Sequence, residues 1–208
     1  MMRILFLMLF ATILPVFGQT ADRPQSSQTD EFEVVPDGYV KMSMDGLYAA
    51  LSNDPAAEGY ILNFGTEREI DLRERQIRKA LEFRRYDPSR VTIVRAGFWK
   101  NARTEFWIVP PGAEIPRATT TAEMFDGFKK LTGEKVRARL DALSVKLRAD
   151  PNLLGYIVIY DSKNEISMRE NQIKRFTGSG KSDLSKVTIK KNESKDGLRT
   201  EIWTIPQK

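Results

Sequence analysis

The chain contains two copies of one sequence unit, and this duplication limits its fold more than any other feature. GYILNF, beginning at Gly59, is matched by GYIVIY, beginning at Gly155, at an offset of 96 residues. At this offset, residues 42–110 align with residues 138–206 without a gap. The unit is longer than a solenoid repeat and long enough to bury its own core, so we predict two similar domains.

The hydrophobic periodicity changes in the same order inside each copy. Apolar residues at helical spacing indicate a first helix around 47–53 and 140–147, and a second at 70–81 and 166–176. Short apolar runs rich in aromatic and β-branched residues indicate strands. The predicted strands are 59–64, 90–98 and 103–109 in the first copy and 155–160, 186–191 and 199–205 in the second, with an extra strand before each copy at 32–41 and 124–130.

We therefore predict an α+β fold of two duplicated α/β sandwich domains. Each has the order helix-strand-helix-strand-strand, with the helices on one face of a mixed sheet. The segment 110–121 is typical of a linker, because its prolines and small polar residues offer little to a core. The predicted organisation is a signal peptide at 1–18, a flexible lead at 19–30, a first repeat at 31–111, a linker at 112–121 and a second repeat at 122–208.

The first residues of the chain indicate export. Arg3 precedes an apolar run from Ile4 to Phe17, and small and polar residues follow, which is typical of a secretory signal cleaved after Gly18. The run is shorter than the about 20 residues that a membrane-spanning helix needs, so we expect no stable membrane anchor. The predicted location is the periplasm or the medium.

The composition narrows the possible chemistry. The sequence has 0 Cys and 0 His, which excludes Ser-His-Asp and Cys-His nucleophiles, imidazole bases and Cys/His zinc sites. No acidic cluster has the spacing of a calcium loop, so we expect neither a metal nor another cofactor. Duplicated acids such as Glu69 and Glu165 leave a carboxylate-dependent glycan hydrolase as an alternative, although salt bridges are the simpler interpretation.

The stretch FTGSGKSDL, residues 176–184, is similar to the end of a phosphate-binding loop. Such a loop requires G-x-x-x-x-G-K-[ST] between a strand and a helix. Here Arg175 occupies the first glycine position, and the stretch follows a predicted helix. We interpret it as a helix end followed by a flexible turn and expect no nucleotide binding.

Arg73 and Arg169 occupy the same place on the apolar stripe of the second helix in each copy. A guanidinium that faces a core is costly unless a carboxylate or several carbonyls meet it. The candidate structural partners are Glu105 and Glu201 on the last strand of each copy, together with Asp54 and Asp150. The alternative is that both arginines receive a ligand carboxylate, to which the planar guanidinium is suited.

The run from the GYI strand through R-x-x-x-I-x-x-x-L to the next strand resembles the OmpA C-terminal-like, peptidoglycan-associating domains. This resemblance implies tandem OmpA-like folds in which Arg73 and Arg169 help to hold the diaminopimelate carboxylate. It also implies that Asp161 stands in for the family's aspartate in the second copy. The segments GYILNF and WIVPPG are similar to those of exported bacterial proteins of unassigned function, which implies the same fold and compartment.

Charge and aromatic residues suggest the kind of partner. Residues 19–111 carry a net charge of −2 and residues 112–208 a net charge of +6, so the second half could attach to an anionic envelope component. No groove-reading helix or aromatic-basic pattern indicates nucleic acid. Trp107 and Trp203 share a strand face with Glu105 and Glu201, which is consistent with core packing or with a stacking platform for sugars.

These observations predict an exported, non-enzymatic protein that binds an envelope component or a protein partner. Peptidoglycan binding through Arg73 and Arg169 and the carboxylate-dependent glycan hydrolase remain the alternatives. A purely structural role in assembly is a further possibility.

Overall fold

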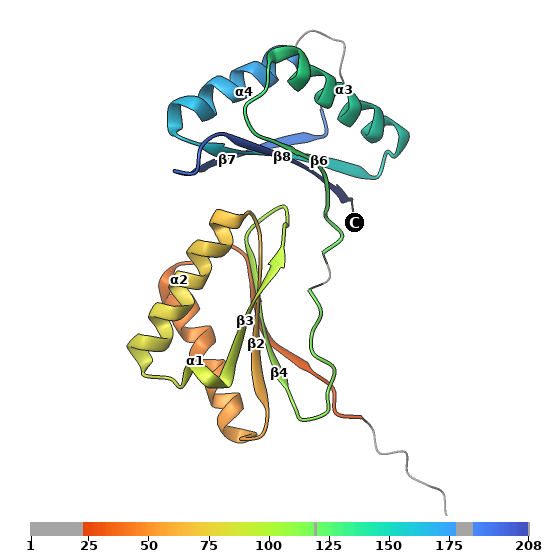
Figure 1. The fold of residues 1–208 in the computed structure, drawn as a ribbon. Coiled ribbons are helices and arrows are strands. Elements are labelled where there is room, and N and C mark those ends of the chain that lie inside the picture. Colours follow the sequence, from red (N-terminus) through yellow and green to blue (C-terminus); the bar gives the residue numbers. More distant parts are fainter. Residues whose placement is uncertain (1–22, 119, 178–184, 208) are drawn as a thin grey trace, which may run out of the picture.

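The computed structural model describes residues 23–118, 120–177 and 185–207, and it has an α+β fold of two units (Figure 1). The predicted signal peptide at 1–18 and Gly180-Lys181-Ser182 lie outside the described residues. Among the residues that are described, no helix is long and apolar enough to cross a membrane.

The two units have the same succession of elements. The first unit contains β1 (Ser27–Phe32), α1 (Asp37–Asn53), β2 (Glu58–Phe64), α2 (Glu67–Arg84), β3 (Val91–Gly97) and β4 (Arg103–Val109), with a short 3-10 helix at Pro88–Arg90 before β3. The second contains β5 (Glu123–Phe128), α3 (Gly133–Ala149), β6 (Leu153–Asp161), α4 (Lys163–Thr177), β7 (Val187–Glu193) and β8 (Arg199–Pro206).

Each unit has one four-stranded mixed sheet, in the order β1-β4-β2-β3 or β5-β8-β6-β7. The β2–β3 and β6–β7 pairs are parallel, and the other pairs are antiparallel. The registers are equivalent as well, because Tyr60 pairs with Trp107 and Tyr156 pairs with Trp203. The predicted fold class of two similar α/β units is therefore confirmed at this level.

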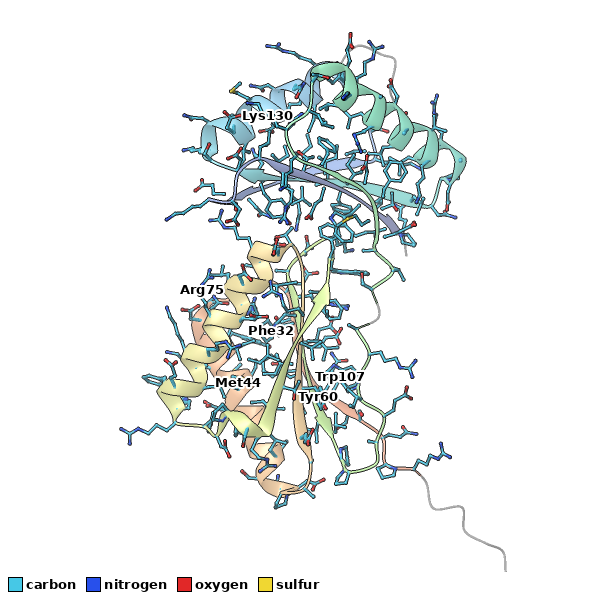
Figure 2. All side chains as sticks on the ribbon, in the orientation of Figure 1. Phe32, Met44, Tyr60, Arg75, Trp107 and Lys130 are labelled. Atoms are coloured by element: carbon cyan, nitrogen blue, oxygen red, sulfur yellow. The ribbon has the colours of Figure 1, made fainter. Side chains whose placement is uncertain are left out.

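Helices cover one face of each sheet (Figure 1). In the first unit, Met44 and Leu47 of α1 and Ile77 of α2 pack on Ile61 and Phe106, and all five side chains are fully or almost fully buried. Because strand side chains alternate, Tyr60 and Trp107 point to the opposite, helix-free face (Figure 2). The second unit has an equivalent core beneath α3 and α4.

A capping box fixes the start of α2. The Thr66 side chain accepts a hydrogen bond from the Glu69 backbone N–H at 3.3 Å, and the Glu69 carboxylate accepts one from the Thr66 N–H at 2.7 Å. This end of α2 points toward the second unit (Figure 1). The capping box therefore holds Glu67 and Glu69 at the end of the first unit that meets the second.

The extra strand predicted at 32–41 is wrong, because Asp37 begins α1 and the strand is β1 at Ser27–Phe32. This strand begins within the segment 19–30 that we expected to be a flexible lead. Of the strands that the structure describes, β1 pairs with β4 alone, and it is mostly exposed, so its sequence SQTDEF needs little hydrophobicity. Val40 and Met44 instead continue the apolar stripe of α1.

Candidate functional site

The two predicted ligand-binding arginines are enclosed between helix and sheet. Arg73 is 6% exposed, and its Nη2 donates a hydrogen bond to the Glu33 carbonyl at 2.9 Å. Its guanidinium carbon lies 4.7 Å from the centroid of the Phe32 ring. Arg169 is 4% exposed and lies over the equivalent ring, Phe128, at 5.6 Å. Both copies thus place the arginine on an aromatic ring, which stabilises a cation.

Neither arginine meets a carboxylate within ion-pair distance among the described residues. Arg169 Nη1 donates to the Gln172 side-chain oxygen at 2.8 Å. Burial lowers the pKa of Arg73, against the effect of Asp37, and burial likewise lowers the pKa of Arg169, against the effect of Glu165. These shifts are the result expected for a guanidinium taken out of water with incomplete pairing.

The expected pairing with Glu105 and Glu201 is corrected by the structure. Glu105 pairs with Arg103 at 2.8 Å, and Glu201 approaches Arg199 at 3.5 Å. Both acids lie on the helix-free face, because they alternate with Phe106 and Ile202, which face the helices. An arginine on the helix side cannot reach them through the sheet.

The remaining predicted acids close turns. Oδ1 of Asp54 accepts from the Ala56 N–H at 3.2 Å, and Oδ1 of Asp150 accepts from the Asn152 N–H at 2.9 Å, just after α1 and α3. Asp161 ends β6 and accepts from the Ser162 N–H at 2.6 Å. The structure therefore does not bring Asp161 together with Arg169 into one site among the residues it describes.

A duplicated row of arginine, glutamate and tryptophan occupies the helix-free face of each sheet. The first row is Arg103, Glu105 and Trp107, and the second row is Arg199, Glu201 and Trp203. The indole Nε1 donates to the glutamate Oε2 in each row, at 3.0 Å in the first and 3.1 Å in the second. The R-x-E-x-W spacing puts the three side chains on one face of a strand.

Each row also stacks its arginine on an aromatic ring of the neighbouring strand. Arg103 lies 4.3 Å from the Phe64 ring centroid, and Arg199 lies 4.2 Å from that of Tyr160. In the second row the Tyr160 hydroxyl donates to Glu201 at 3.2 Å. Burial raises the pKa of Tyr160, and the charge of Glu201 raises it further.

The first unit covers the second row. The Phe98 ring, after β3, lies nearly parallel to Trp203 with 4.7 Å between centroids and 18° between planes. It also meets Tyr156 edge-on at 5.9 Å. The Glu67 carboxylate at the start of α2 forms an ion pair with Arg199. The second row is therefore part of the contact between the units.

Further contacts surround this aromatic centre. Lys190 Nζ lies 3.0 Å from Glu69 Oε1, and Arg68 donates to the Glu193 carbonyl at 2.9 Å. Phe98 and Trp99 belong to one buried apolar cluster that includes residues of both units. The units are thus joined by packing as well as by charge.

The first row borders a cavity of about 330 Å³. We call it the tryptophan cavity; its lining residues are Trp99, Arg103, Glu105, Trp107, Pro116, Arg117 and Thr121. The last three belong to the segment predicted as a linker, which runs beside the first sheet (Figure 1). Its volume lies in the range of small-molecule sites, and its lining combines indole rings with a few polar groups.

The Glu105 carboxylate at the tryptophan cavity has two hydrogen-bonding or ion-pair partners. The two Glu105 oxygens are engaged, one by Arg103 and the other by the Trp107 indole, so two partners fix the position of this carboxylate. It is the one acid among the described residues that line the cavity. A pair of carboxylates, which glycosidases use, is therefore not assembled in the cavity.

Sequence reasoning identified the duplicated R-T-E-x-W segments but not the groups that distinguish the copies. Phe98, Trp99 and Arg117 were not singled out, and the first two stand in a hairpin that differs between copies. The equivalents of Phe98 and Trp99 in the second unit are Ser194 and Lys195. Two adjacent aromatic residues in a polar hairpin were the available signal.

No protein-family model matches the chain, and no curated protein matches it in sequence. Among the described residues, no group of three or more acidic side chains could hold a metal ion.

Proposed function

We propose that this is an exported, non-enzymatic protein that binds a glycan component of the cell envelope through the tryptophan cavity. The periplasm or the medium is the proposed location, on the basis of the predicted signal peptide. The main observation that supports this proposal is that the two equivalent rows have different surroundings. Phe98 of the first unit stacks on Trp203 of the second row, and both units line the cavity of about 250 Å³ beside that row. The first row instead borders the larger tryptophan cavity, which is lined by the first unit and the linker.

The side chains of the tryptophan cavity suit a sugar. An indole ring offers a flat apolar surface to the C–H face of a pyranose, and Trp107 is only partly buried. The Thr121 hydroxyl and the Glu105 carboxylate offer hydrogen-bond acceptors for sugar hydroxyls. The groups next to Trp107 therefore complement a polyhydroxylated ring better than a purely apolar ligand.

Peptidoglycan binding through Arg73 and Arg169 is the second candidate. It draws on the resemblance to OmpA C-terminal-like domains, which is also a proposal. The nearly complete burial of both guanidinium groups disfavours it, because a ligand carboxylate would have to displace Phe32 or Phe128. A structural contribution to helix-on-sheet packing explains the two arginines with fewer assumptions.

A pull-down on purified peptidoglycan tests the two candidates against each other. We expect Trp107→Ala to weaken retention by roughly tenfold or more, the effect of losing a central aromatic contact. The double variant Arg73→Met/Arg169→Met keeps the apolar volume and should retain wild-type binding. Phe83→Ala is the control, since this ring is 65% exposed on α2, on the helix side of the sheet.

Thermal melts establish that each variant is folded, and Trp107→Phe provides a milder change in the same place. Loss of retention in the arginine variant, with Trp107→Ala unchanged, would favour the second candidate. Wild-type retention of all variants, or no retention of the wild type, would remove the proposal for peptidoglycan.

A further inference from the structure

The contact between the two units reveals which chemistry a row of this kind accepts. The second row receives two groups from the first unit: the flat Phe98 ring on Trp203 and the Glu67 carboxylate on Arg199. The rows have the same residues in the same strand register. This contact shows that a tryptophan of such a row accepts a flat ring and that an arginine beside it accepts a carboxylate.

A second copy of this chain does not supply these groups from its second unit. The residues equivalent to Glu67 and Phe98 are Lys163 and Ser194, so the carboxylate is replaced by a cation and the ring by a hydroxyl. A lysine would be repelled by the arginine of the first row. The second unit of another copy is therefore a poor match for the tryptophan cavity.

The charges around the tryptophan cavity favour an anion. Arg103 is already paired with Glu105 at 2.8 Å and lies 3.6 Å from Glu31. Within the described part of the chain, Glu114 is the one ion-pair partner of Arg117, and the two side chains are 75% and 80% exposed, respectively. Such a pair contributes little, so the Arg117 guanidinium is available to a ligand.

We infer that the tryptophan cavity binds a sugar ring that carries a carboxylate, with the ring on Trp107 and the carboxylate on Arg117. This inference rests on the proposed function and specifies its ligand class. Trp99 forms a further apolar wall, and Glu105 and Thr121 meet the hydroxyls. The linker thereby contributes the cation that selects acidic over neutral sugars.

Titrations with D-glucuronate and D-glucuronamide test the inference, because the two compounds share a ring and differ in charge. Tryptophan fluorescence is a suitable readout, since two of the 3 tryptophans line the cavity. We expect the acid to bind the full-length mature protein about tenfold more tightly than the amide, the effect of one charge-assisted hydrogen bond. Arg117→Gln should remove this preference.

Arg137→Gln is the matched control, because it removes the same charge from an exposed site on α3 and should keep the preference. Equal binding of acid and amide, with Trp107→Ala weakening both, would overturn the inference but leave the proposed function intact. Absence of glucuronate binding beside Trp107-dependent retention on peptidoglycan would also overturn it. If Trp107→Ala changes neither assay, the proposed function fails first and the inference fails with it.

Discussion

Phe98 should carry most of the contact between the two units. The residue is 3% exposed and touches Trp203 and Tyr156 through their rings. Replacing a buried phenylalanine by alanine costs about 3–5 kcal/mol, and Phe98→Ala should fall near 3 because two large neighbours can move into the space. The ion pair of Glu67 with Arg199 is partly exposed and contributes on the order of 0.5 kcal/mol.

Phe98→Ala should weaken the coupling between the two units more than it destabilises either core. We expect the wild-type protein to unfold in urea in one transition, because the aromatic contact links the two cores. In Phe98→Ala the fluorescence and far-UV circular dichroism transitions should separate, because two of the 3 tryptophans lie in the first unit whereas the helices and strands of both units contribute to the circular dichroism. Small-angle X-ray scattering should show a larger radius of gyration.

Phe83→Ala is the matched control, and it should change the free energy of unfolding by no more than about 0.5 kcal/mol because the ring is exposed. A loss below about 1 kcal/mol in Phe98→Ala, with coincident transitions and unchanged scattering, would refute the reasoning. Raising the salt concentration should have a smaller effect than Phe98→Ala, because the ion pairs contribute less than the rings.

Two further predictions concern single positions in the first unit. Gly59→Ala should destabilise the protein by about 1–3 kcal/mol, because the added Cβ would lie 2.6 Å from Val91 Cγ1. Gly46→Ala should stabilise α1 by about 0.5–1 kcal/mol, because nothing lies within 4 Å of the added Cβ. The urea midpoints of the two variants would check both predictions. The Tyr48 hydroxyl donates to the Asp87 carbonyl at 2.5 Å, and burial raises the pKa of Tyr48 from 10.0 to about 12. Because the folded pKa is the higher one, this stabilisation is complete below pH 10 and is lost as the pH rises toward 12. Urea unfolding should therefore show the stability difference between wild type and Tyr48→Phe shrinking over that range, and a constant difference would contradict the assignment.

The duplicated core could be predicted from sequence because its signals are local. The GYI runs are apolar on both faces, and the apolar stripes of the helices recur at the same offset. Each strand and helix is therefore indicated independently in both copies. β1 escaped prediction for the opposite reason. It is an edge strand that pairs with β4 alone among the described strands, and Phe32 is its one buried residue. A comparison of Phe32 with Phe128 and of Asp30 with Asp126 at the same offset would have placed it.

The site was harder to predict than the fold because its identity depends on contacts between segments that are distant in sequence. The R-T-E-x-W segments are alike, and nothing in them says which copy is covered. The paired residue on the neighbouring strand, Phe64 or Tyr160, is also similar in both copies. The contact of the second row with the first unit is made by Phe98 and Glu67, whose equivalents in the second copy are Ser194 and Lys163. The expectation that Glu105 would pair with Arg73 failed because the two lie on opposite faces of the sheet.

The differences between the copies explain why one pair of domains can have two kinds of contact. Directly after a duplication, both units have the same row and the same helix N-terminus. Either helix N-terminus could then dock on either row. With Lys163 and Ser194 in place of Glu67 and Phe98, the second unit cannot repeat the docking. The second unit therefore lacks the two groups that the first unit uses in this contact. Beside the first row, the linker residues Pro116 and Arg117 line the tryptophan cavity. The row that binds the two units together and the row proposed to bind a ligand thus use the same side chains, and the surrounding residues decide between them.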